Sequence, residues 1–341
     1  MNHIATLPDL QDAHDKAGAA SLGYGREAIA FLGMSRFGGV GFHTLTKLGG
    51  RRGISDLLES KSVAEVERCL AAAGARLGRG VCLPEGWDEF RQQLWHLGQE
   101  SARPLIARGI RFLFSDDDAF PSRLARMPEV LRPHWIFVAG DLGLLERPSL
   151  AIVGTRDASE TGSFLSRYAV SCAAELGAPV VSGLAHGIDR LVHEWCLHVS
   201  LPTISVLGTG ILVNYPARHA PLSDAILAAG GALVSEYLPD QEPSGQQFVW
   251  RNRLQAALGC ATIPVEWKQK SGTAHTVRFS RTLERPVFGL DLVGVPRAAG
   301  AGKGDQNFVV PSEHESFIDA LRKHLLAAVA KLEQRQGVLF N

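Results

Sequence analysis

Three residues that suit phosphate chemistry follow a short apolar run in the middle of this chain. The run covers residues 150–153, and Gly154, Thr155 and Arg156 come directly after it. A short apolar run that ends at glycine is typical of a strand buried on both faces of a sheet. Ligands bind at the carboxyl ends of such strands in open α/β sheets, so these residues are candidates for an anion site.

The same pattern recurs further along the chain. Residues 179–181 are apolar and lead into Ser182 and Gly183, and Gly187 and Asp189 then open a helical segment. Small residues at two strand ends leave backbone N–H groups exposed, and such groups at helix N-termini bind phosphates. For Asp189 a helix-capping role is the alternative.

Aromatic and basic residues are mixed in the segment QQFVWRNR. It contains Phe248, Trp250, Arg251, Asn252 and Arg253. Rings on which bases stack, next to cations that track phosphates, are typical of sites for single-stranded nucleic acid, and each stacked base contributes roughly 1–3 kcal/mol. The alternative is that the rings pack in the core and the arginines lie at a solvated helix start.

The sequence offers little for catalysis. A GxGxxG fingerprint after the first core strand and a GxxxxGK[ST] loop are absent, which disfavours NAD binding and an ATPase motor. Ser182 and Ser271 lack a GxSxG elbow. Glu236 and Glu266 end strands and could act as a base, although a glutamate there can equally bind backbone N–H groups. We therefore expect no catalytic residue, no metal site and no cofactor.

Composition limits where a nucleic acid could bind. The formal net charge is +0, with a pI of about 7.2, so any such site must be a local basic patch. No apolar run reaches the roughly 18 residues of a membrane helix, and the first residues lack a signal-peptide core. Five scattered cysteines without a CxxC pair indicate reduced thiols. We expect a cytoplasmic protein that makes no contact with a membrane.

Strand-like and helical segments alternate between residues 103 and 312. This alternation is typical of an α/β domain with a doubly wound, mostly parallel, Rossmann-like sheet, and residues 286–290 are its last predicted strand. Residues 1–102 predict a small helical domain of the SAM or helix-hairpin-helix type. Its segment Gly39-Val40-Gly41 could hold a DNA phosphate in a hairpin turn, or could serve as a turn alone.

The last segment, residues 313–341, is predicted to be a helix followed by a short tail. Residues 316–334 place apolar side chains on one helical face. Gln336, Leu339 and Phe340 then form a Q-x-x-L-F pentapeptide similar to the peptides with which bacterial DNA-maintenance proteins dock on the sliding clamp. A tail folded against its own domain is the alternative.

From residue 112 to residue 308 the sequence resembles the DNA-processing protein A (DprA/Smf) family. The motifs GTR, SGLAHGID, LGTG, NYP, SEY, FVWRNR and SGT occur in the family's order. The resemblance implies a Rossmann-like core that binds single-stranded DNA without a cofactor, dimerises, and loads the recombinase RecA in natural transformation. It assigns DNA or phosphate binding to Gly154, Thr155, Arg156, Ser182, Gly183, Gly187, Asp189, Phe248, Arg251, Asn252, Arg253, Ser271 and Gly272.

Two functions follow from these patterns. The first is a non-enzymatic mediator of recombination that binds single-stranded DNA. The second is a sensor or hydrolase of a small nucleotide that uses the same loops, with Glu266 as the candidate base. The PGGxGTxxE signature of related phosphoribohydrolases is absent, which argues against that hydrolase activity.

Overall fold

Contacts between Cα atoms divide the chain into two units. The structure, a computed structural model, describes residues 22–75, 83–296 and 302–339, with side chains up to Lys331. One unit runs to Phe120 and includes Pro133–Phe137, and the other comprises Pro121–Arg132 and the chain from Val138 onward. The predicted boundaries at residues 102 and 312 remain predictions.

The first unit carries the predicted helical domain. Its core is aromatic, because the ring of Phe31 lies 5.2 Å from that of Phe112 and 4.6 Å from that of Trp135. Gly39, with φ of +79°, turns the chain ahead of the next helix, and Val40 is buried beside it. The helices described in this unit are α2 (Arg26–Met34), α3 (Phe42–Leu48), α4 (Arg51–Leu58), α5 (Val63–Ala72) and α6 (Trp87–Ala107).

The main sheet has seven strands in the order β1-β2-β6-β5-β4-β3-β7. The four pairings from β6 through β5, β4 and β3 to β7 are all parallel. Every residue of β4, β5 and β6 is buried, as expected for strands covered on both faces. The strands are β1 (Arg111–Phe114), β2 (Trp135–Gly140), β3 (Ser149–Gly154), β4 (Val180–Ser182), β5 (Thr203–Val206), β6 (Ala232–Ser235) and β7 (Gly259–Val265).

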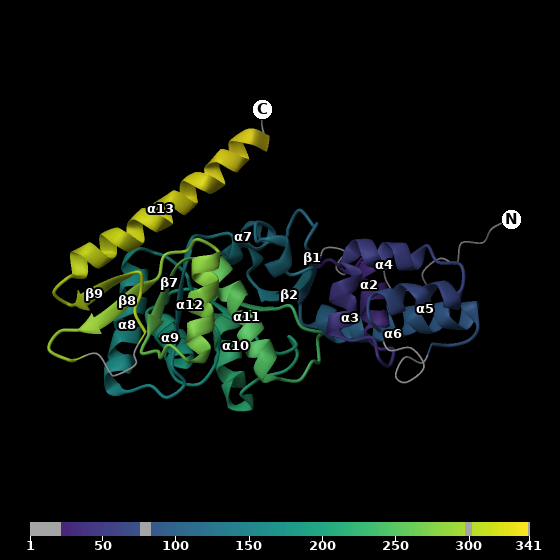
Figure 1. Cartoon of the computed structure of the whole chain (residues 1–341), viewed down its shortest axis with the longest axis horizontal. Helices are drawn as coiled ribbons and strands as arrows, with labels where there is room; N and C mark the ends of the chain where they lie inside the picture. Colours follow the sequence, from purple (N-terminus) through teal and green to yellow (C-terminus); the bar gives the residue numbers. More distant parts are fainter. Residues whose placement is uncertain (1–21, 76–82, 297–301, 340–341) are drawn as a thin grey trace. The chain divides into compact units, whose positions relative to one another are not determined.

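Helices cover both faces of this sheet. Helices α8 and α9 contact each other and β3, whereas α11 and α12 contact each other and β7 from the opposite face (Figure 1). This arrangement confirms the predicted doubly wound, mostly parallel fold. The helices of this unit are α7 (Ser122–Ala125), α8 (Glu160–Glu175), α9 (Ile188–His198), α10 (Ala220–Ala228), α11 (Gly245–Leu258), α12 (Gly272–Thr282) and α13 (His314–Leu339), with short 3-10 turns at Glu129–Leu131, Leu142–Leu145 and Ala217–His219.

The chain reverses its direction across the sheet at β3. From β3 it steps through β4 and β5 to β6, and it then returns past β3 to add β7 on the other side. A crevice opens at the carboxyl ends of the two strands that flank such a reversal. The topology therefore places the ends of β3 and β7 at the expected ligand site.

The last predicted strand does not extend the main sheet. Strand β8 (Phe288–Leu292) pairs in parallel with β9 (Gln306–Val310) in a separate two-stranded sheet. Strand β9 was not predicted from the sequence. Both backbone groups of Val287 are bound by Asp305, whose N–H donates to the carbonyl of Val287 at 2.7 Å and whose carboxylate accepts from the N–H of Val287 at 3.1 Å. An isolated bridge from Val287 to Thr262 joins this segment to β7.

Helix α13 follows the predicted amphipathic pattern over its first half. Phe317, Leu321 and Leu325 are buried on one face, as expected from their spacing, whereas Val329 on the same predicted face is 36% exposed because the helix has left the sheet there. The predicted clamp-docking residues lie outside the described part, since Phe340 is beyond it and the side chains of Gln336 and Leu339 are not described. In the described residues no helix combines the length and apolarity that crossing a membrane requires.

Candidate functional site

A pocket of about 410 Å³ lies at the carboxyl ends of β3 and β7. Its walls come from the loop after β3, the start of α9, one face of α11 and the first turn of α12. The structure therefore brings together segments that are far apart in the sequence. The predicted residues that line the pocket are Gly154, Thr155, Arg156, Asp189, Phe248, Arg251, Asn252, Ser271 and Gly272.

The loop after β3 is held by the starts of two helices. A Cβ atom on Gly154 would lie 2.6 Å from Cγ1 of Ile188, so only glycine lets α9 approach the strand this closely. The backbone N–H of Ile188 donates to the carbonyl of Thr155 at 3.0 Å, and Oγ1 of Thr273 donates to the carbonyl of Gly154 at 2.9 Å. Gly187, with φ of +73°, makes the turn into α9.

Arg251 places a buried positive charge in the wall of the pocket. Arg251 is only 4% exposed. Its Nη1 donates to the carbonyl of Gly183 at 2.8 Å and also to the carbonyl of Val206. Its Nε is buried and has no hydrogen-bond partner. Burial raises the pKa of the nearby Asp189 carboxyl above its ordinary value, while the Arg251 charge acts in the opposite direction.

Gln255 is a pocket residue that the sequence reasoning missed. It lines the pocket one helical turn beyond Arg251, and its Nε2 is buried without a hydrogen-bond partner. Phe248, Arg251, Asn252 and Gln255 follow the spacing i, i+3, i+4, i+7, which puts them on one face of α11. That spacing was the signal in the sequence that could have identified Gln255.

The first turn of α12 has no side-chain cap. Ser271 is the N-cap, but its Oγ donates to the carbonyl of Lys268 at 2.6 Å and makes no capping bond to the helix. Nδ2 of Asn252 donates to the carbonyl of Gly272 at 3.1 Å and fixes this end against α11. An uncapped helix N-terminus carries partial positive charge. Together with the unpaired nitrogens of Arg251 and Gln255, it makes the pocket suited to an anion.

Two rings and an exposed arginine form the rim of the site. The guanidinium of Arg156 lies 5.5 Å from the centre of the Phe248 ring, and the Tyr215 ring lies 5.1 Å from the same ring. Tyr215 is 44% exposed, whereas Phe248 is half-buried. Tyr215 belongs to the NYP motif, and the sequence did not predict it as a site residue. The rim can stack a base and bind a phosphate at once.

Some predicted residues support the site from outside the pocket. Arg253 is 2% exposed, pairs with Glu236 through both terminal nitrogens, and donates from Nε to the carbonyl of Leu131 at 2.8 Å. Oγ of Ser182 donates to the carbonyl of Ile152 at 2.7 Å within the sheet. Gly183 and Gly187 shape the backbone beside the pocket. The structure therefore does not bring the Arg253 side chain to the anion site.

The two candidate bases are also used within the fold. Glu236 is the partner of Arg253, and Oε2 of Glu266 accepts a hydrogen bond from the N–H of Ser159 at 2.8 Å. Neither side chain lines the pocket. Among the residues that the structure describes, His, Cys, Asp and Glu side chains form no group of three or more that could hold a metal ion.

Comparison with known families agrees with this geometry. A family model described as DNA recombination-mediator protein A matches residues 111–323, which is more than half of the 341 residues. The chain belongs to this family. It is 36% identical to the protein Smf of Escherichia coli over 187 residues, which cover 54% of this chain and 50% of Smf.

Other members share both sequence and fold with this chain. It is 36% identical over 174 residues to the DNA processing protein DprA of Streptococcus pneumoniae, covering 51% of this chain and 60% of that protein. An X-ray structure of DprA from the same organism superposes with a TM-score of 0.59 at 23% identity, over 88% of this chain and 96% of that one. The matched part of the chain thus spans about half the length of these relatives' sequences.

Proposed function

We propose that this protein binds single-stranded DNA in the pocket between β3 and β7 and mediates recombination without a catalytic step. The observation that carries this proposal is the buried Arg251, whose Nε has no partner, beside the uncapped N-terminus of α12. A buried donor without a partner costs free energy, which an anionic ligand would recover. Membership of the recombination-mediator family supports DNA as the source of that anion.

The rim favours a single strand over a duplex. The exposed ring of Tyr215 and the half-buried ring of Phe248 lie beside Arg156, and bases can stack on such rings only when they are unpaired. The net charge of the chain is +0, so attraction to DNA depends on this local site. Glu266, the candidate base of the small-nucleotide hydrolase, accepts a hydrogen bond from the N–H of Ser159 and does not line the pocket, which favours DNA binding over that hydrolase.

Further parts of the proposal follow from the family resemblance. We infer that the protein acts as a homodimer and delivers the bound strand to RecA. The tail residues Gln336, Leu339 and Phe340 are proposed to dock on the sliding clamp. A fluorescent QGVLF peptide titrated with purified clamp tests this last part, and a peptide with Leu and Phe changed to Ala is its control.

The test of DNA binding compares two arginines at opposite ends of β3. Arg156 follows the strand at the pocket, whereas Arg147 precedes it, and both are exposed. Binding of fluorescent oligo-dT, and of a duplex of equal length, is measured by anisotropy over a salt series. We expect salt-dependent single-strand binding that Arg156→Ala weakens by about ten-fold or more and Arg147→Ala leaves unchanged. Absence of single-strand binding by the wild type at physiological salt would overturn the proposal.

A further inference from the structure

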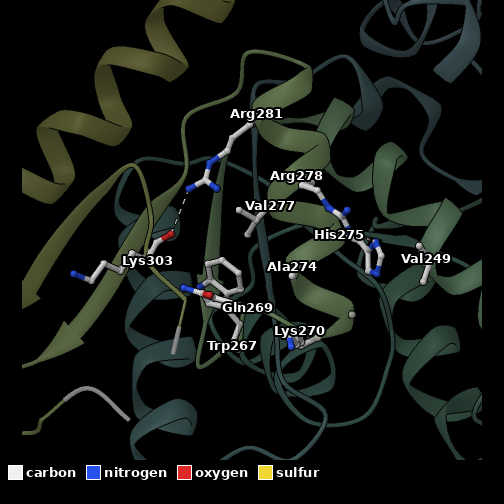
Figure 2. A pocket seen from close by; sticks show the side chains of 12 residues that line it. Val249, Trp267, Gln269, Lys270, Ala274, His275, Val277, Arg278, Arg281 and Lys303 are labelled. Carbon is white, nitrogen blue, oxygen red and sulfur yellow. Dashed lines mark hydrogen bonds between the residues drawn. The ribbon is translucent and has the colours of Figure 1, made fainter. Parts of the chain in front are cut away.

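A second and larger hollow lies along the outer side of α12. It has a volume of about 920 Å³ and is formed by α12, the segment between β7 and α12, and the chain just before β9. We call it the α12 groove. Figure 2 shows Lys303 on one side of it, Arg278 and His275 on the other, and Trp267 between them. Its lining residues are Val249, Trp267, Gln269, Lys270, Ser271, Gly272, Ala274, His275, Val277, Arg278, Arg281 and Lys303.

The α12 groove is basic and its lining contains no carboxylate. Within the described ranges, no acidic group lies within ion-pair distance of Lys270, Arg278 or Lys303, and Arg281 pairs with Asp305 at 2.8 Å. Cations that have no counter-charge within ion-pair distance attract an anionic ligand. The groove therefore favours an anionic ligand, although the whole chain has a net charge of +0.

His275 orients one of these cations. Its Nδ1 accepts a hydrogen bond from Nη2 of Arg278 at 2.8 Å. Burial, and then the charge of Arg278, lower the pKa of His275 below its ordinary value, which keeps the imidazole neutral and able to accept this bond. The guanidinium of Arg278 itself remains exposed at the rim.

The floor of the α12 groove is apolar. Trp267 is 8% exposed and Val277 is 1% exposed, and both pack together in one small core cluster with Ala274 against it. The backbone N–H of Gly302 donates to the carbonyl of Trp267 at 2.9 Å and holds the two sides of the floor together. An apolar floor between basic rims suits the sugar and base of a nucleotide, with its phosphate directed to a rim.

The α12 groove is continuous with the DNA pocket. Val249, Ser271 and Gly272 line both, so the groove begins at the N-terminus of α12, where the pocket ends. Arg278 lies roughly 9 Å further along the helix from Gly272, at 1.5 Å per residue. Cations spread over this length on two sides of a groove match an extended polyanion better than a single phosphate.

We propose that the α12 groove is a second DNA-binding segment, which holds the backbone of nucleotides that continue from the pocket. This inference rests on the proposed function, since the strand must first occupy the pocket. A short oligonucleotide fills the pocket alone, and a longer one also reaches the groove. The cations of the groove therefore contribute to affinity only above a certain length of strand.

The experiment measures binding of oligo-dT of about four and about sixteen nucleotides, the range of lengths that single-strand sites occupy. The variant combines Lys270→Gln with Arg278→Gln. Its matched control combines Lys323→Gln with Lys331→Gln, which removes the same charge from exposed positions on α13. We expect the variant to bind the long strand about ten-fold more weakly than the control does, with a salt slope smaller by about 1.4, since each lost phosphate contact reduces it by about 0.7. Binding of the short strand is expected to stay at the level of the control.

Three results would contradict this inference, and they differ from one another. If the wild type binds neither strand, the proposed function fails and the inference fails with it. If the wild type binds both and the variant binds the long strand as the control does, DNA does not reach the α12 groove. If the variant loses affinity equally for both lengths, these cations act on the pocket and do not extend the path.

Discussion

Nη1 of Arg251 donates a hydrogen bond to the carbonyl oxygen of Gly183 at 2.8 Å. This bond joins α11 to the end of β4, on the far side of β3 from β7. It also fixes the side chain of Arg251, which lines the pocket and whose buried Nε has no protein partner. The anion site therefore depends on how closely the backbone of Gly183 approaches the Arg251 side chain.

Gly183→Ala is expected to disturb both binding and stability. The new Cβ would lie 2.5 Å from Oδ2 of Asp189 and from Nε2 of Gln255, and would also crowd Arg251. We expect the free energy of unfolding to fall by about 1–3 kcal/mol, as for other overpacked sites, and DNA affinity to fall with it. Urea denaturation and oligo-dT anisotropy measure the two effects.

Gly245→Ala is the matched control. Gly245 also lines the pocket, but nothing lies within 4 Å of its would-be Cβ, and it begins α11. Alanine there is expected to leave stability unchanged or slightly higher, because alanine is the better helix former. Equal behaviour of the two variants would show that the close approach at Gly183 is unimportant.

Arg253→Met is expected to lower stability strongly. Arg253 and Glu236 are both buried and paired, so removing one partner leaves the other as an unpaired buried charge and costs about 3–5 kcal/mol. Arg156→Ala changes an exposed side chain and is expected to shift stability by at most about 0.5 kcal/mol while reducing DNA binding. Chemical denaturation of both variants separates the roles of the two arginines.

The pairing itself can be checked with a double variant. Arg253→Met combined with Glu236→Gln removes both charges, so it is expected to cost less than the sum of the single changes. A different result would follow if Arg253 contacted DNA: Arg253→Met would then keep the wild-type denaturation midpoint and lose oligonucleotide binding.

Phe248→Leu is expected to weaken binding of single strands. Leucine keeps apolar volume against Gly208 but removes the ring that Arg156 and Tyr215 contact. The loss of one base stack corresponds to about 1–3 kcal/mol, or roughly 5- to 150-fold in affinity. Phe248→Tyr keeps a ring and should bind oligo-dT like the wild type. Equal affinities of the Leu and Tyr variants would rule out stacking on this ring.

Stability is expected to fall as the pH is lowered from about 6.5 towards 3. Burial, and then the charges of Arg251 and His219, lower the pKa of the fully buried His193 to about 3 in the folded protein. The unfolded pKa of histidine is about 6.5, so between these values the unfolded chain binds more protons and gains free energy relative to the fold. One such group changes stability by up to about 1.4 kcal/mol per pH unit.

His193→Asn tests this pH dependence. An amide can replace the hydrogen bond between Nδ1 of His193 and Oγ1 of Thr203, but it does not titrate. Urea midpoints measured from pH 7 to pH 4 should therefore vary less steeply for the variant than for the wild type. Parallel curves would mean that another group causes the loss of stability in acid.

Local chemistry along the chain was enough to predict the strand ends that carry the site. The apolar run that ends at Gly154 predicted a buried strand leading into a turn, and the structure adds that α9 packs closely against this glycine. The fold class followed from the alternation of strands and helices, and the family from the order of the motifs. Each of these properties depends on residues that are close together in the sequence.

Only the tertiary structure decided what the two arginines of FVWRNR do. Arg251 and Arg253 are the same type of residue, but side chains two positions apart on an α-helix point in directions that differ by about 200°. One guanidinium therefore faces the pocket, and the other faces the buried carboxylate of Glu236. The α12 groove was equally invisible in the sequence, because Lys270 and Lys303 line one groove only when α12, the segment after β7 and the chain before β9 have folded together.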